Sequence, residues 1–227
     1  IDVIETLVIN DGSTDRTAEI AKQNGVNHII SFTKRKGLAR AFGAGLDAAL
    51  KAGADIIVNT DADGQYRGED IPRLVQPILK GEADIVIGNR DIDNVRQFSW
   101  VKKRLQHIGS AIVRQLSGST ILDATTGFRA YNRDAALKLN IISNYTYTLE
   151  SIIQAEHKDL AISNIMISTN EVQRQSRLFR SIPEYLKRSM VTIIRVYSMF
   201  NPFRLFTTIG TGTITIGVII GGRFIKK

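Results

Sequence analysis

The chain has 227 residues, a net charge of +8, no cysteine and 43% apolar residues. This length fits one domain with appendages, and the apolar content excludes a disordered or fibrous protein. The lack of cysteine excludes a disulfide scaffold, a cysteine zinc site and a thiol nucleophile, whereas the positive charge favours an anionic partner.

The first 90 residues alternate between short β-rich runs and helical segments. The apolar runs predict strands at residues 6–10, 27–32, 55–60 and 84–88. The intervening segments predict helices at 15–23, 37–52 and 71–80. The run at 55–60 has consecutive apolar residues at its centre, which is typical of a strand buried on both faces. This alternation favours an α/β fold with a mostly parallel sheet flanked by helices.

The pattern loosens after residue 100. A basic helix is expected at about 101–116, another helix at 149–157 and a β run at 160–168. Short β segments are expected near Ile121 and Phe128. The chain starts at Ile1 without an initiator Met or a signal peptide, and we expect both termini to be cuts through a longer protein.

The C-terminal part is basic and then uncharged. Residues 171–204 carry seven cations against two acids, and the following residues, 205–222, carry no charge. The uncharged run approaches the roughly 20 residues that cross a bilayer, and cations before it would meet anionic head groups. These features favour a membrane helix, with a buried pair of core strands as the alternative. Residues 182–200 have near-helical apolar spacing, which predicts a helix lying on the membrane or packed on the domain.

Charged residues follow the ends of three predicted strands. Asp11 follows the first, Asp61 and Asp63 follow the third, and Arg90 follows the fourth. In an open α/β sheet these ends share the edge at which ligands bind. Two carboxylates at i and i+2 can bind Mg²⁺ or Mn²⁺, with a diphosphate completing the coordination shell. An ordinary Asp-rich turn is the alternative explanation.

Four motifs carry a family resemblance. They span residues 7–15, 53–65, 84–90 and 123–129, in this order. Together they resemble a family 2 glycosyltransferase of the Rossmann-like GT-A fold, in the polyprenyl-phosphate, dolichol-phosphate mannosyltransferase-like branch. The resemblance implies metal-dependent, inverting transfer of a sugar from a nucleotide-diphosphate sugar to a dolichyl or undecaprenyl phosphate. It also implies a membrane-associated enzyme, integral in the full-length parent, with its catalytic domain on the cytoplasmic face.

The resemblance assigns roles on the donor side. Asp11 matches the acid that contacts the base or ribose, and Asn10 stands where the family often has a second acid. Asp61 and Asp63 match the metal-binding pair. Gln65 matches a further donor contact.

On the acceptor side, the resemblance assigns catalytic roles to Arg90 and Asp123. Arg90 matches a cation near the acceptor phosphate. Asp123 matches the acid proposed as catalytic base, although it could equally orient the acceptor or a cation. Further candidates for holding the acceptor phosphate are the cations Lys103 and Arg104 and the basic-loop residues Arg174, Ser176 and Arg177.

These matches predict three regions. A GT-A catalytic domain covers 1–170, a basic loop and amphipathic juxtamembrane helix cover 171–204, and a transmembrane helix covers 205–222. The family's opening strand would precede Ile1. A nucleotidyltransferase, another GT-A enzyme that uses sugar nucleotides, or a non-enzymatic membrane-recruited domain are the alternatives. No stacking motif or recognition helix supports nucleic-acid binding, and the oligomeric state is not predicted.

Overall fold

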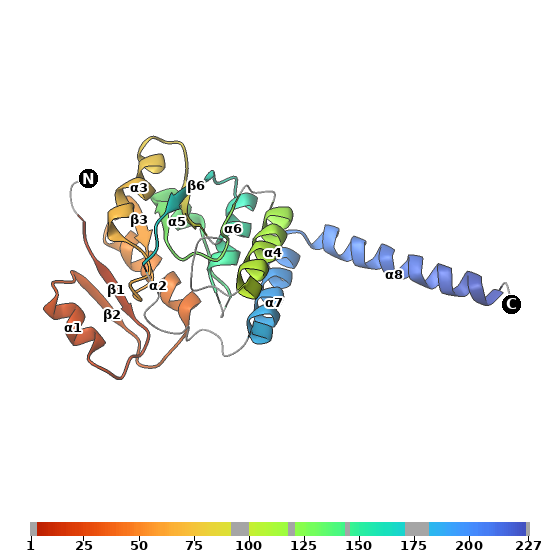
Figure 1. The fold of residues 1–227 in the computed structure, drawn as a ribbon, viewed down its shortest axis with the longest axis horizontal. Helices are drawn as coiled ribbons and strands as arrows, with labels where there is room; N and C mark the ends of the chain where they lie inside the picture. The colour runs from red at the N-terminus through yellow and green to blue at the C-terminus, as the bar shows by residue number, and fades with distance from the viewer. Residues whose placement is uncertain (1–3, 92–99, 118–120, 144–145, 171–181, 226–227) are drawn as a thin grey trace.

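The computed structural model of the chain describes residues 4–91, 100–117, 121–143, 146–170 and 182–225. Within these residues, six strands form two sheets (Figure 1). The smaller sheet pairs β1 (Leu7–Asn10) with β2 (His28–Ser31) in parallel. The larger sheet has the order β3-β5-β4-β6, with strands β3 (Ile56–Asn59), β4 (Ile85–Arg90), β5 (Arg129–Asn132) and β6 (Ile162–Ile167).

The α/β class is confirmed, but the larger sheet is mixed. β6 runs parallel to β4, whereas β5 is antiparallel to both of its neighbours. Arg129, the first residue of β5, pairs with Asn59, the last residue of β3, and with Ile87 in the middle of β4. The chain therefore reaches the ligand-binding edge just before β5 and runs back from it, which places the preceding loop at that edge.

Two local predictions are wrong. Ile121 does not lie in a strand; it is a core residue, 1% exposed, whose carbonyl accepts a hydrogen bond from Arg114. β3 is half-buried along its length because it pairs only with β5 within the described residues. The strand buried throughout is β4 instead, since it has a neighbour on each side.

Helices cover both faces of the larger sheet. Side chains alternate along a strand, so Ile85 and Ile87 of β4 pack in one core cluster and Val86 packs in another. The first cluster includes residues from α2, α5 and α6, and the second includes Leu74 of α3. The helices are α1 (Thr17–Gln23), α2 (Leu38–Lys51), the short 3₁₀ turn η1 (Gly68–Asp70), α3 (Ile71–Leu79), α4 (Trp100–Ser117), α5 (Arg133–Lys138), α6 (Thr148–His157), α7 (Ile182–Phe200) and α8 (Pro202–Ile225).

The two C-terminal helices differ in their packing. α7 lies beside α6 and buries one stripe, which includes Ile193 and Val196. α8 extends away from the rest of the molecule (Figure 1), and its side chains are almost all exposed. At the junction, the His157 ring stacks on Phe200 at 5.0 Å, and its Nε2 lies 2.6 Å from Nδ2 of Asn201.

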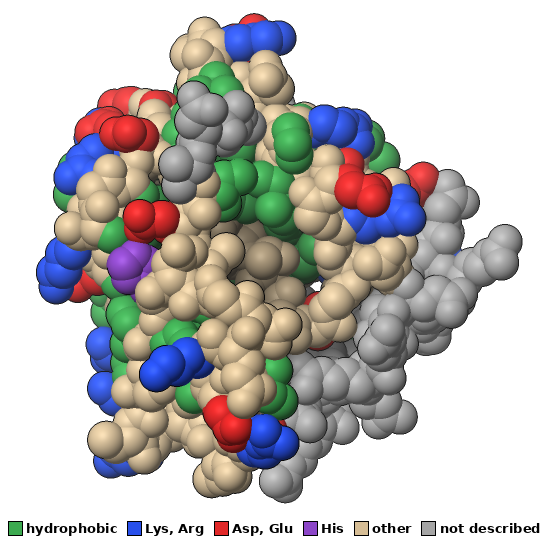
Figure 2. Space-filling view, turned by 90° about the vertical axis from the view of Figure 1, so that its left-hand side faces the viewer, with side chains coloured by type: hydrophobic (Ala, Val, Ile, Leu, Met, Phe, Trp, Pro, Cys, Tyr) green, Lys and Arg blue, Asp and Glu red, His purple; other side chains and the backbone are tan. Residues whose placement is uncertain are grey.

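The opposite end of the molecule carries the smaller sheet. Figure 2 views this end: charged side chains lie mainly around its edge, and hydrophobic side chains are visible near its centre. This distribution agrees with the half-burial of β1 and β3.

Candidate active site

The site is built where β3 and β4 end and β5 begins. Asp61 and Asp63 follow β3, Arg90 is the last residue of β4, and the loop 123–128 precedes β5. The main chain joins these parts, because the Gly88 N–H donates to the carbonyl of Phe128 at 2.9 Å. The structure thus brings together the third and fourth predicted motifs and the Asp61–Asp63 pair.

Asp61 is a half-buried carboxylate that accepts no hydrogen bond from the described residues. Burial raises the pKa of Asp61, and the nearby carboxylate of Asp63 raises it further. Asp63 is also half-buried, and its Oδ1 accepts the Gln65 N–H at 3.0 Å. A carboxylate that lacks donors and has a second carboxylate beside it favours a bound cation.

The carboxylate oxygens of Asp61 and Asp63 fit a hard divalent ion. Carboxylate oxygens are the ligands that Mg²⁺ and Mn²⁺ prefer. Within the described part of the chain, no group of three or more His, Cys, Asp or Glu side chains could hold a metal. An ion held by Asp61 and Asp63 would therefore take its other ligands from water, from other oxygens or from a substrate. Mg²⁺ commonly binds in this way, through one or two carboxylates and substrate phosphates.

Arg90 and Asp123 form a buried, two-point ion pair. Arg90 Nε donates to Asp123 Oδ2 at 2.7 Å, and Nη2 donates to Oδ1 at 3.1 Å. The Thr125 hydroxyl and N–H also donate to Oδ1, at 2.9 and 3.1 Å. Burial alone would raise the pKa of Asp123, but the Arg90 charge and these hydrogen bonds lower it overall. Burial opposes the charge on Arg90, and Asp123 outweighs this effect, so the pKa of Arg90 is raised.

A second buried arginine shapes the loop. Arg129 is fully buried, and its guanidinium donates to the carbonyls of Ala124, Thr126 and Thr148 at 2.9 Å. It also donates to the Ser151 hydroxyl at 2.8 Å. One side chain therefore satisfies two carbonyls of the 123–128 loop and ties the loop to α6.

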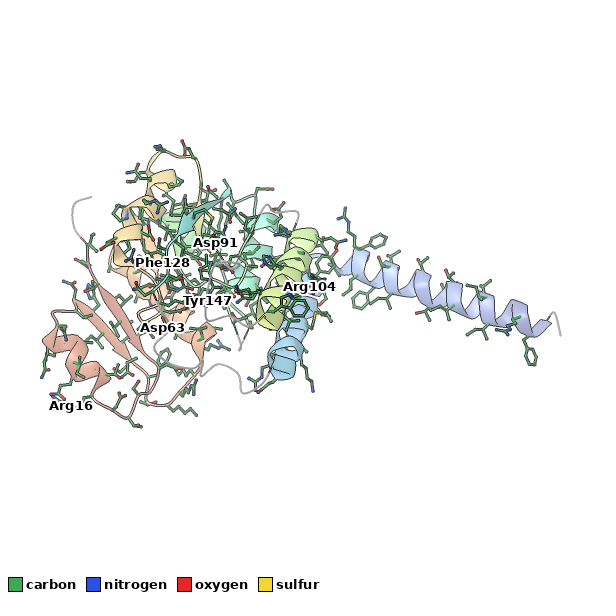
Figure 3. All side chains as sticks on the ribbon, viewed as in Figure 1. Arg16, Asp63, Asp91, Arg104, Phe128 and Tyr147 are labelled. Atoms are coloured by element: carbon green, nitrogen blue, oxygen red, sulfur yellow. The ribbon has the colours of Figure 1, made fainter. Side chains whose placement is uncertain are left out.

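Two tyrosines that the sequence motifs do not include contact Gly127. The Tyr66 hydroxyl accepts hydrogen bonds from the Gly127 N–H and the Thr126 hydroxyl, each at 3.2 Å. The Tyr147 hydroxyl lies 2.7 Å from Nδ2 of Asn59, which also donates to the Gly127 carbonyl at 2.7 Å. In Figure 3, Tyr147, Phe128 and Asp63 lie in the same part of the molecule. The sequence signal for Tyr66 was its position three residues after Asp63; none marked Tyr147.

Asp11 lies at the end of β1 and braces the start of α2. Its Oδ1 and Oδ2 accept the N–H groups of Lys36 and Gly37 at 2.6 and 2.9 Å. Asn10, in the position of the family's second acid, is buried, and its Oδ1 accepts the Ser13 N–H at 3.0 Å. Both residues fix loops at the edge of the smaller sheet. The predicted contact between Asp11 and a nucleotide remains a prediction.

Gln65 follows Asp63 by two residues and is buried. Its carbonyl accepts the Asn170 N–H at 2.8 Å, and the Asn170 amide donates to the Gly64 carbonyl at 3.0 Å. Tyr66 and Thr169 also form an isolated β-bridge. The segment after β6 therefore holds the loop that contains Asp63.

The other residues predicted to hold the acceptor phosphate lie on α4 or outside the described residues. Arg104 is exposed and lies over the Trp100 ring at 5.7 Å, and Figure 3 places it toward α4, away from Asp63. Lys103 is half-buried on the same helix. α4 contacts the site loop through Ser110, whose hydroxyl accepts the Ala124 N–H at 3.2 Å. The predicted basic-loop residues Arg174, Ser176 and Arg177 lie outside the described residues.

Comparison with known proteins identifies the family. The family model for glycosyl transferase family 2 matches residues 1–139. Polyprenol monophosphomannose synthase of Mycolicibacterium smegmatis is 29% identical over 179 residues, which cover 74% of this chain and 67% of the relative. UDP-N-acetylglucosamine–dolichyl-phosphate N-acetylglucosaminyltransferase of Methanococcus voltae is 31% identical, with coverage of 72% and 73%.

A solved structure supports the same fold. Glucosyl-3-phosphoglycerate synthase of Mycobacterium tuberculosis, in complex with Mn²⁺, uridine diphosphate and phosphoglyceric acid, matches with a TM-score of 0.67 at 21% identity. The match covers 87% of this chain and 67% of that structure. The GT-A-like fold is therefore confirmed. Because the family model covers more than half of the chain, the chain belongs to glycosyl transferase family 2.

Proposed function

We propose that this glycosyltransferase moves a sugar from a nucleoside-diphosphate sugar to a polyprenyl phosphate at a membrane, with a divalent cation and with inversion. The observation that carries the proposal is Asp61, a half-buried carboxylate to which no described residue donates a hydrogen bond, placed beside Asp63 and close to the Arg90–Asp123 pair. The named relatives from Mycolicibacterium and Methanococcus have polyprenol or dolichyl phosphate in their names, which supports this class of acceptor. The structural neighbour was solved with Mn²⁺ and uridine diphosphate, which supports a metal-bound donor.

Asp61 and Asp63 would hold Mg²⁺ or Mn²⁺, which would neutralise the diphosphate leaving group. The acceptor is a phosphate monoester with a second pKa of about 6, so it is mostly a dianion at neutral pH. It therefore needs little activation as a nucleophile. The harder task is to hold two anions close together, and a buried cation on a rigid strand is suited to this task. Arg90 is such a cation.

Asp123 then acts on Arg90 and not on a substrate proton. Both of its oxygens already accept hydrogen bonds, its pKa is lowered overall, and its side chain is fully buried. A general base needs a free oxygen within reach of the proton that it removes. Of the roles that the sequence left open for Asp123, the geometry favours orientation of the Arg90 guanidinium.

Membrane attachment would come from α8 and the exposed face of α7. Within the described residues, Pro202–Phe224 is the one segment long and apolar enough to cross a bilayer. As a helix, α8 is about 36 Å long, which exceeds the ~30 Å hydrocarbon core. α7 exposes apolar side chains and cations together, namely Met190, Val191, Ile194, Met199, Lys187, Arg188 and Arg195. Such a face suits the boundary of an anionic membrane, which we propose is the cytoplasmic one.

The central test is a transfer assay with purified full chain. UDP- and GDP-sugars would be supplied with undecaprenyl or dolichyl phosphate and with Mn²⁺ or Mg²⁺, and lipid-linked sugar would be measured. Asp63→Asn should lose about tenfold or more in turnover, because it weakens the metal site. Asp55→Asn is the matched control, because Asp55 is exposed and precedes the same strand. Metal-independent transfer by the Asp63 variant would refute the metal assignment, and the lack of transfer to either lipid would refute the acceptor.

The membrane proposal has its own assay. The full chain should float with vesicles at high salt, because α8 is apolar. A chain ending at Asn201 should bind only anionic vesicles, with binding that weakens as salt screens its cations. Salt-independent binding of the shortened chain to neutral vesicles would contradict the role given to Lys187, Arg188 and Arg195.

A further inference from the structure

The hydroxyl of Tyr66 has an unusual set of partners. It accepts two hydrogen bonds at 3.2 Å, one from the Gly127 N–H and one from the Thr126 hydroxyl. A phenol oxygen can accept up to two such bonds and can donate one. No described residue accepts the hydrogen of this hydroxyl. Both acceptor positions are therefore occupied, and the donor position is left without an acceptor among the described residues.

The burial of Tyr66 makes this free donor informative. The side chain is 9% exposed, and its ring stacks on Phe128 with centroids 5.1 Å apart. The ring cannot swing toward bulk solvent without breaking this stack and both accepted bonds. Buried polar groups in native proteins nearly always have a partner. A fixed, buried hydroxyl with an unused hydrogen is therefore typical of a ligand contact.

The surroundings of Tyr66 indicate the ligand's chemistry. Gly127, which donates to Tyr66, lies so close to Asp61 that a Cβ on it would be 2.8 and 3.0 Å from the two carboxylate oxygens. Thr126, the other donor, is next to Thr125, which hydrogen-bonds Asp123 in the pair with Arg90. The Tyr66 hydroxyl is thus bonded to two residues of a loop that contacts both the proposed metal carboxylate and the Arg90–Asp123 pair. An anionic oxygen that is drawn to both a metal ion and Arg90 would be placed to accept its hydrogen.

We propose that Tyr66 is a substrate-binding residue whose hydroxyl donates a hydrogen bond to a phosphate oxygen held between the Asp61 metal site and Arg90. The inference rests on the proposed function for its substrates, but the contact itself does not depend on turnover. The two bonds that the hydroxyl accepts polarise its O–H group and make it a better donor. The phosphate belongs either to the diphosphate of the donor or to the monoester of the acceptor. These two sources require separate ligands in the test.

Tyr147 provides a matched control. It is a second buried tyrosine at Gly127; its hydroxyl donates to the Gly127 carbonyl at 3.3 Å and its ring stacks on Phe42 at 3.8 Å. Tyr147→Phe and Tyr66→Phe each remove one hydroxyl group that contacts Gly127, and each keeps the stacked aromatic ring. Only Tyr66→Phe removes a hydroxyl whose hydrogen lacks a described acceptor. A purely structural role would make the two variants alike.

The test measures binding to the full 227-residue chain by calorimetry in detergent. The ligands are UDP and GDP with Mn²⁺, which report the diphosphate, and farnesyl phosphate, which reports the monoester. Tyr66→Phe should weaken one class by about tenfold or more, the size of a lost hydrogen bond to a charged group. Tyr147→Phe should change the same affinity by less than about threefold. Equal effects of the two variants, or wild-type affinity of Tyr66→Phe for all three ligands, would overturn the proposal.

A second measurement keeps the two hydrogen bonds that the Tyr66 hydroxyl accepts. Replacing Tyr66 by 3-fluorotyrosine keeps the ring and oxygen but makes the hydroxyl a stronger donor, so the affected ligand should bind more tightly. Unchanged or weaker binding would count against a donated bond. A wild-type chain that binds these ligands but transfers no sugar would refute the proposed function alone. A chain that binds none of them would refute both.

Discussion

The buried Arg90–Asp123 pair makes a quantitative prediction about stability. Arg90→Met removes the positive charge and leaves the fully buried Asp123 carboxylate with only the donors of Thr125. Breaking a buried ion pair from one side typically costs about 3–5 kcal/mol. For a chain of this size, that cost corresponds to a fall in Tm of roughly 6–20 °C. The cost should appear in urea denaturation of the free protein, independently of any substrate.

Arg16 and Glu19 provide an exposed control. Arg16 Nε and Nη2 donate to the two Glu19 carboxylate oxygens, each at 2.8 Å, and the two side chains are 68% and 51% exposed. Exposed ion pairs contribute little to stability, so Arg16→Met should lower the free energy of unfolding far less than Arg90→Met. Both pairs join an arginine to a carboxylate through two contacts, so the difference between the two variants reports mainly the effect of burial. Equal costs would refute the reasoning.

The pKa of Asp123 also predicts how the stability cost of Arg90→Met changes with pH. In the wild type, Asp123 has a lowered pKa, so its contribution is present above the unfolded pKa of about 3.9 and is lost as pH falls through the lower folded value. Without Arg90, burial dominates and raises the pKa of Asp123. The folded variant then takes up a proton before the unfolded chain does, so its deficit should shrink as pH falls from 7 toward 4. A deficit that does not change with pH would contradict this account, and the Arg90→Met/Asp123→Leu double variant should recover much of the loss.

Three further substitutions test other parts of the structure. Asp61→Asn should not destabilise the metal-free protein at pH 7, because it removes a poorly solvated charge, and thermal denaturation should show that Mn²⁺ stabilises the wild type but not this variant. Gly12→Ala should cost more than Gly53→Ala in urea denaturation, because both glycines have positive φ but only a Cβ at Gly12 would lie 2.6 Å from backbone atoms. Arg129→Lys should cost about 3 kcal/mol or more in the same assay, because a single ammonium cannot replace donors aimed at three carbonyls and a hydroxyl.

The sequence was sufficient for those parts of the site that follow strands. Asp61 and Arg90 could be placed because apolar runs end next to them, and the ends of parallel strands share one edge of a sheet. The direction of β5 could not be predicted in this way. Its four residues have no distinctive pattern, and its direction follows from the loop that returns the chain to the edge at Arg129.

The sequence also could not identify side chains whose role depends on contacts made only in the folded chain. Tyr147 lies more than 80 residues from Asn59, and only the folded chain brings its hydroxyl within 2.7 Å of that amide. The apolar character of Ile121 indicated a strand, although the residue is buried as part of a loop. Local pattern indicates that a residue is buried but not which element buries it, and this limit explains the wrong prediction at Ile121.

The charges around the 123–128 loop have a consequence for the order in which ligands bind. Arg90 and Arg129 supply two positive charges, and Asp61, Asp63 and Asp123 supply three negative ones, so these five side chains have a net charge of −1 when all are ionised. A divalent cation changes this sum to +1. The ion therefore reverses the sign of the local electrostatic potential, from one that repels a phosphate dianion to one that attracts it. Kinetics with this arrangement should be ordered, with the metal and its nucleotide entering before the anionic lipid.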